Sequence, residues 1–172
     1  LGPLMFQFGY LNRQAMPSQA AFHERLADLA ANLPAGYEWA VETRNPNYLN
    51  PAYFDLLRQI RLVPVLQQGY YLPPVPEVYA RHADLLPDTL VLRLHGPDRD
   101  GIEGRTGKRW SGLADPRDAE IDALAGVLRD IRARKRKAKV FANNHFEGCA
   151  PLTLRRLQAR LEGRPDEDLP PP

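Results

Sequence analysis

The sequence has a single cysteine, Cys149, among its 172 residues. One thiol cannot form an internal disulfide, and this excludes the small secreted proteins that depend on several bridges. A lone cysteine also suits a reducing compartment. Because no charged segment followed by an apolar one marks a signal peptide near the start, we predict a cytoplasmic protein.

Long apolar runs and an excess of one charge are missing too. No stretch reaches the roughly 18 apolar residues that mark a membrane helix, so we predict no membrane partner. The 23 basic and 21 acidic residues leave a net charge of only +2, which gives no broad footprint for a polyanion. Hydrophobic residues make up 44% of the chain, enough for the core of about one domain.

Five short apolar runs rich in β-favouring residues recur along the chain. Four of them are nearly continuous rather than alternating, which is typical of strands buried on both faces of a parallel sheet. Helix-sized segments separate them, so we predict an α/β fold built from right-handed βαβ units. The predicted strands are Leu4–Phe8, Tyr37–Thr43, Leu62–Leu66, Thr89–His95 and Lys139–Asn143.

Four helices are predicted from apolar residues at helical spacing and from capping residues. Ser18 is a good N-cap for the first, and Asn50 followed by Pro51 is a good start for the second. The predicted helices are Ser18–Ala31, Pro51–Ile60, Pro116–Lys137 and Ala150–Leu161. Two long connections remain, a proline-rich one after Leu66 and a glycine-rich one at 96–115. We expect one domain over 1–162 and a disordered, proline-rich tail over 163–172.

Polar and charged residues stand at the ends of three predicted strands. Residues two apart on a strand share a face, which pairs Glu42 with Arg44 and Arg93 with His95; Asn143 and Asn144 end the fifth run. Charged groups inside apolar strands are costly unless they are paired or used. Ligands of parallel α/β proteins bind at the carboxyl ends of the strands, so we predict a site there.

The residue types in this predicted site suit a small anionic or sugar-like ligand. We assign the binding of the anion to Arg44 and Arg93 and the orientation of the ligand to Asn143 and Asn144. Glu42 and His95 are the candidate catalytic residues because both side chains can transfer protons. An arginine beside Glu42 should keep its carboxylate ionised, which favours a base over an acid.

Each of these residues also has a structural explanation. Glu42 and Arg44 can form an ion pair that tethers a loop, and Arg93 can pair with Glu42 across the sheet. His95 can be an interior histidine whose hydrogen bonds are satisfied, and asparagines such as Asn143 and Asn144 often cap turns and helices. On these alternatives the polar cluster is structural and the protein is not an enzyme, so enzymatic activity stays open.

Other features give weaker signals. Segment 129–139 carries seven basic residues in eleven; it can bind nucleic acid, although cations at a helix C-terminus explain it better. Cys149 with His145 can form a nucleophilic pair, but a small buried thiol is the simpler interpretation. No zinc-like spacing of ligands is present, so we assign no metal, and the sequence indicates no particular cofactor.

Four short segments occur in the order found in one known family. These segments, Leu1–Phe8, Glu42–Arg44, Arg93–Gly96 and Asn143–Asn144, make the chain similar to the YecE-like family, or domain of unknown function 72. The resemblance reaches about Leu157. It implies a TIM-barrel-like (β/α) fold and no established reaction.

This sequence also departs from the family's pattern. The family's opening strands have no counterpart, so we expect the C-terminal portion of a longer protein and a partial barrel of about five strands. Gln67 and Gln68 stand where the family often has aspartate. The substitution argues against a mechanism that needs a metal ion or two carboxylates.

Overall fold

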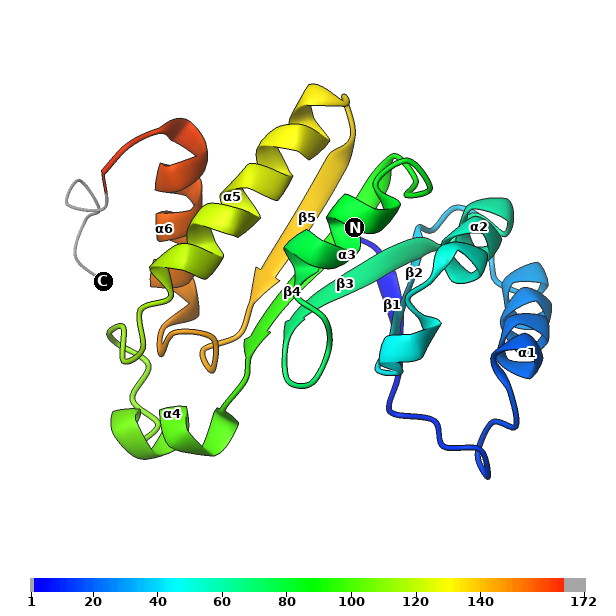
Figure 1. Cartoon of the computed structure of the whole chain (residues 1–172), viewed down its shortest axis with the longest axis horizontal. Coiled ribbons are helices and arrows are strands. Elements are labelled where there is room, and N and C mark those ends of the chain that lie inside the picture. The colour runs from blue at the N-terminus through cyan, green and yellow to red at the C-terminus, as the bar shows by residue number, and fades with distance from the viewer. Residues whose placement is uncertain (1, 166–172) are drawn as a thin grey trace.

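The computed structural model describes residues 2–165, which form a five-stranded parallel sheet with helices beside it (Figure 1). The strands lie side by side in chain order, β1-β2-β3-β4-β5. All five predicted strands are confirmed, with β3 extended to Gly69 beyond the predicted Leu66. The strands are β1 (Leu4–Phe8), β2 (Trp39–Thr43), β3 (Val63–Gly69), β4 (Thr89–Gly96) and β5 (Lys137–Ala142).

The four predicted helices are confirmed, and two begin as their capping residues indicate. The Ser18 hydroxyl accepts a hydrogen bond from the Ala21 N–H, and the Asn50 side chain accepts one from the Tyr53 N–H. The helices are α1 (Gln19–Ala31), α2 (Pro51–Gln59), α5 (Asp118–Ala133) and α6 (Ala150–Glu162). A short 3-10 helix, Pro46–Tyr48, precedes α2. Of the predicted disordered tail, residues 166–172 lie outside the described part of the chain.

The two predicted long loops each contain a helix, so the prediction was wrong there. Helix α3 (Val75–His82) begins with prolines in its first turn, where the missing N–H removes no hydrogen bond. Helix α4 (Arg99–Thr106) is capped by Asp98, which accepts from the Gly101 N–H. Glycines within α4 lower its helix propensity, and this explains why the sequence pattern did not show it.

The two faces of the sheet have different chemistry. Leu90, Leu92 and Leu94 of β4 point outward into the main core, which they share with apolar side chains of the helices. Between them, Val91 points inward, where it packs with Ala40, Val63 and Val65 in a small second cluster. Alternation along a strand therefore places Arg93 and His95 on the inner face as well.

The sheet is curled, as in part of a barrel. Lys139 Nζ of β5 lies 2.6 Å from Oε2 of Glu38, just before β2. Nearer the other end, Arg93 of β4 donates to Oε1 of Gln7 in β1 over 2.9 Å. These strands are not neighbours in the sheet, so both contacts span the concave inner face. The predicted partial (β/α) barrel of five parallel strands is thus confirmed.

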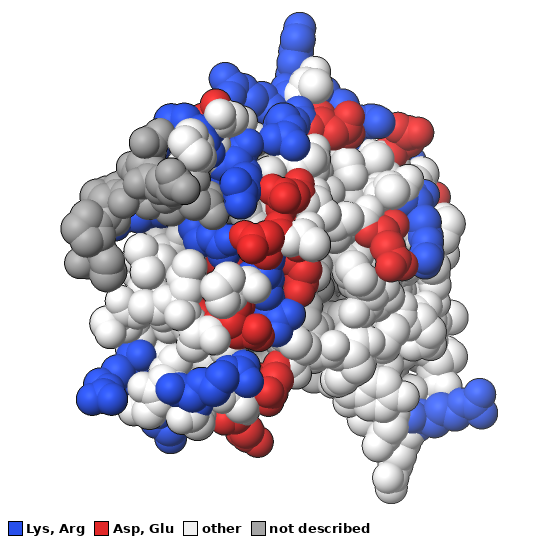
Figure 2. All heavy atoms as spheres, turned by 60° about the vertical axis from the view of Figure 1, so that its left-hand side comes forward, with Lys and Arg blue, Asp and Glu red and all other residues white. Residues whose placement is uncertain are grey.

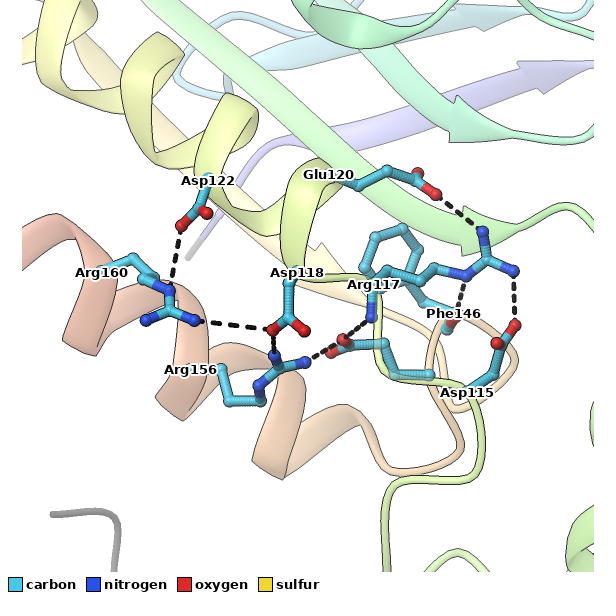
Figure 3. A network of polar contacts seen from close by, with 9 residues as sticks. Asp115, Arg117, Asp118, Glu120, Asp122, Phe146, Arg156 and Arg160 are labelled. Carbon is cyan, nitrogen blue, oxygen red and sulfur yellow. Dashed lines mark hydrogen bonds and ion pairs between the residues drawn. The ribbon is translucent and has the colours of Figure 1, made fainter. Parts of the chain in front are cut away.

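Polar contacts fix the loop between β5 and α6 to helix α5 (Figure 3). Arg117 donates to Asp115 over 2.6 Å, to Glu120 over 2.7 Å and to the carbonyl oxygen of Phe146 over 2.9 Å. Arg156 of α6 contacts both Asp118 and the completely buried Glu147. Glu147 also accepts from the backbone N–H of Arg117.

We expect the buried partner in this network to matter far more than the exposed one. Glu147→Ala leaves the buried Arg156 charge without its interior partner, and we expect it to lower the free energy of unfolding by about 3–5 kcal/mol. Asp118, whose side chain is 65% exposed, is the matched control. Asp118→Ala should cost less than about 1 kcal/mol, and urea unfolding of both variants measures the difference. Equal costs would contradict this ranking.

Candidate functional site

Glu42 lies at the centre of the inner face, near the carboxyl ends of the strands. Its side chain is completely buried, and each carboxylate oxygen contacts a different arginine. Oε1 lies 3.2 Å from Nε of Arg44, and Oε2 lies 2.5 Å from a terminal nitrogen of Arg93. The structure therefore brings together three of the predicted site residues, and Glu42 orients both guanidiniums.

The charges of this cluster do not cancel. Two guanidiniums face one carboxylate, and no other carboxylate among residues 2–165 contacts Arg44 or Arg93. The arginine side chains are 24% and 22% exposed, so they reach from the buried carboxylate to solvent. One positive charge is left over at the open end of the sheet, where a small anion has access to it.

His95 lies beside the arginines, against an aromatic ring. The centroid of its imidazole is 5.6 Å from that of Tyr70, and the Arg44 guanidinium lies over the same Tyr70 ring at 5.2 Å. Tyr70 has a backbone φ of 55°, which is uncommon for an aromatic residue. This conformation places its ring between Arg44 and His95.

The surroundings keep His95 neutral near pH 7. Burial lowers the pKa of His95 from 6.5 to about 4; the positive charges of Arg93 and Arg44 lower it further, while Glu42 opposes them. The side chain is only 7% exposed. A neutral imidazole carries one acceptor and one donor nitrogen, so His95 can accept a proton from a ligand.

The two predicted asparagines have different surroundings. Asn143 lines a small cavity of about 70 Å³ together with Arg93 and His95, and its side-chain oxygen accepts from the N–H of His145. The side-chain oxygen of Asn144 accepts from the N–H of Ala150 at the start of α6. The contact of Asn144 is the helix cap that the sequence offered as the structural alternative.

The sequence analysis did not identify Tyr70 and Gln7 as members of this cluster. Gln7 is adjacent to Glu42 in the register of β1 and β2 and accepts from Arg93. Its place on the inner face follows from strand alternation, but its role depends on the curl of the sheet. Tyr70 carries a signal that is visible only in its backbone, the positive φ after Gly69.

Below the polar cluster, the inner face is apolar and partly open. Met5 at 39% and Phe141 at 54% exposure are among the most exposed apolar side chains of the described residues. They border a hollow of about 230 Å³ whose rim includes Arg93. The candidate site thus has a charged upper layer and an apolar floor.

The basic segment 129–139 is largely engaged by the protein itself. Arg134 contacts Asp84 and Asp130, each over 2.7 Å, and Lys139 contacts Glu38. Arg136 donates to the carbonyl oxygen of Ala83. On the face that carries α5 and α6, Figure 2 shows acidic and basic side chains intermixed rather than a patch of one sign.

Three further sequence features have plain structural surroundings. Cys149 is buried at the start of α6, while His145 contacts Asn143 and Glu103 and packs against Trp110. In the described part of the chain, no group of three histidine, cysteine or acidic side chains is arranged to hold a metal ion. Nor does any helix there have the length and apolar character needed to cross a bilayer.

Comparisons with known proteins extend these observations. The family described as "Protein of unknown function DUF72" matches residues 1–172. A crystal structure of a DUF72 family protein from Thermotoga maritima MSB8 is 21% identical with a TM-score of 0.63, and its alignment covers 92% of this chain. One from Enterococcus faecalis V583 is 19% identical with a TM-score of 0.61 over 93% of this chain. This chain spans 58% of the length of each, and no curated protein matches it.

The pKa of His95 predicts how stability depends on pH. The unfolded chain binds a proton near 6.5, whereas folded His95 binds one only near 4. Acid therefore favours unfolding: the stabilisation is present above about pH 6.5 and is lost as the pH falls toward 4. We expect His95 to account for about 3 kcal/mol of the loss over this range.

Urea unfolding of the wild type and of His95→Gln at several pH values measures this contribution. The free energy of unfolding of the variant should fall less steeply between about pH 6.5 and pH 4. Parallel pH profiles for the two proteins would contradict the assignment.

Proposed function

This chain belongs to the DUF72 family, whose function is unknown, and from its site we propose that it binds a small anion at the carboxyl ends of its strands. The single observation that carries the proposal is the unequal charge of the cluster. Arg44 and Arg93 share one carboxylate, that of Glu42, and a bound anion would balance the remaining charge. Arginine is well suited to this role because its planar fork binds carboxylates and phosphates through two hydrogen bonds.

Glu42 positions the arginines in this proposal. Both of its oxygens already accept from guanidinium groups, so the contacts favour an orienting role over the proton transfer expected from the sequence. A carboxylate between two arginines also fixes their separation. The anion then meets guanidiniums whose orientation needs little further ordering.

His95 is the proton-transfer group of the proposal. Its imidazole is neutral near pH 7 and lies beside both arginines. A ligand held by its anionic group would place a neighbouring hydroxyl or C–H bond next to this base. Asn143, which lines the same small cavity as His95, would orient the ligand, whereas Asn144 serves the start of α6. Action in the cytoplasm remains a prediction from the lone cysteine.

A nucleic-acid partner has no comparable support. The basic segment 129–139 begins in α5 and enters β5, at the amino-terminal end of the strand. The anion site lies at the opposite end of the sheet. Because many of its cations already contact carboxylates or carbonyl oxygens, no observation favours this second function.

Removing one arginine tests the proposal. Arg44→Gln should weaken the binding of inorganic phosphate about tenfold or more, because a hydrogen bond to a charged group contributes about 1.5–3 kcal/mol. Isothermal titration calorimetry at low ionic strength measures the affinity. Arg58→Gln is the matched control, because Arg58 is an exposed arginine of α2 that contacts Asp55. The proposal fails if phosphate does not bind, or if both variants bind it as the wild type does.

A further inference from the structure

Gln67 lies on the inner face of the sheet next to the proposed anion site. It shares this face with Val65, since the intervening Leu66 belongs to the outer core. In the register of β3 and β4, Gln67 stands opposite Arg93. Neighbouring strands lie about 4.8 Å apart, so the carboxamide and the guanidinium are close enough to contact one small ligand.

The carboxamide of Gln67 is buried without a hydrogen-bond partner. The residue is only 4% exposed, and within residues 2–165 neither Oε1 nor Nε2 has a partner. The adjacent Gln68 behaves differently: its Nε2 donates to Glu120 over 2.6 Å, and its Oε1 accepts from the N–H of Val75 over 2.8 Å. Gln68 thus joins the sheet to its helices, whereas Gln67 has no such structural role.

A buried amide without partners destabilises a fold. Such a group is expected where a ligand completes its hydrogen bonds, because functional sites are often less stable than the protein could make them. Its position beside Arg93, on the face that carries Glu42 and His95, makes the ligand of the anion site the natural partner.

The chemistry of the amide restricts that ligand. The side chain of Gln67 offers both a donor and an acceptor. A bare anion only accepts hydrogen bonds, so it would satisfy the donor and leave the acceptor unpaired. A hydroxyl group beside the anionic group supplies the missing donor.

We propose that Gln67 selects ligands that carry a hydroxyl group next to their anionic group, the arrangement found in 2-hydroxy acids and in hydroxylated phosphate esters. This inference rests on the proposed anion site and adds the substrate class to it. Arg44 and Arg93 hold the charge, and Gln67 distinguishes the hydroxylated molecule from its deoxy analogue. A site built to pair with a ligand hydroxyl rejects the analogue that leaves the buried group unpaired.

Matched pairs of probes test the inference. Lactate is compared with propionate, and glycerol 3-phosphate with propyl phosphate, by calorimetry on the full chain. We expect the wild type to bind the hydroxylated member of at least one pair about tenfold more tightly, the effect of about one hydrogen bond. A preference in only one pair would identify a carboxylate or a phosphate as the anionic group.

Gln67→Met, an apolar variant of similar shape, should bind both members of each pair equally. Gln59→Met is the matched control, because Gln59 is an exposed residue at the end of α2, and it should keep the preference. The urea midpoint of Gln67→Met should equal or exceed that of the wild type, since the variant removes a buried amide without partners. A marked fall in the midpoint would show a structural amide and overturn the inference.

The remaining outcomes separate the two proposals. If the wild type binds phosphate and propionate but shows no preference in either pair, the role of Gln67 is overturned and the anion site stands. If a preference persists in Gln67→Met, another residue reads the hydroxyl and the role of Gln67 is again overturned. If no anion binds, the proposed function itself fails.

Discussion

The buried carboxylate of Glu42 is the constraint on which the rest of the site depends. A completely buried charge must be paired, because its desolvation is costly. One of its partners, Arg93, comes from β4, which is separated from β2 by the intervening strand. The ion pair therefore spans the concave face and requires the curl of the sheet. The same pairing leaves an excess positive charge beside His95, and this contributes to the low pKa of His95.

The two ends of the sheet differ in how completely their polar groups are paired. At the amino-terminal end, Lys139 pairs with Glu38, and Arg134 pairs with two aspartates. At the carboxyl end, Gln67 has no partner and Tyr70 adopts a positive φ. Strain and unsatisfied polar groups gather at functional sites because selection there acts on the ligand as well as on stability. This asymmetry supports a site at the carboxyl end.

Much of this arrangement could be predicted from the sequence. Buried strands appear as apolar runs, so all five strands were found, and strand alternation placed Glu42, Arg44, Arg93 and His95 at one end of one face. Helices α3 and α4 were missed because prolines and glycines hide helical spacing. The partners of Glu42, the ring of Tyr70 and the isolation of Gln67 depend on the curl of the sheet and on one backbone angle. Neither quantity has a signature in local sequence.

The most direct test of the account is the pKa of His95, measured by NMR with and without sulfate, an anion that stays fully charged through the titration. Without sulfate, we expect the imidazole to titrate near pH 4. Bound sulfate would balance the excess charge of Arg44 and Arg93 and should raise the pKa of His95 clearly. A pKa of about 6.5 in the free protein, or a low pKa that saturating sulfate leaves unchanged, would contradict a cationic anion-binding cluster at the carboxyl ends of the strands.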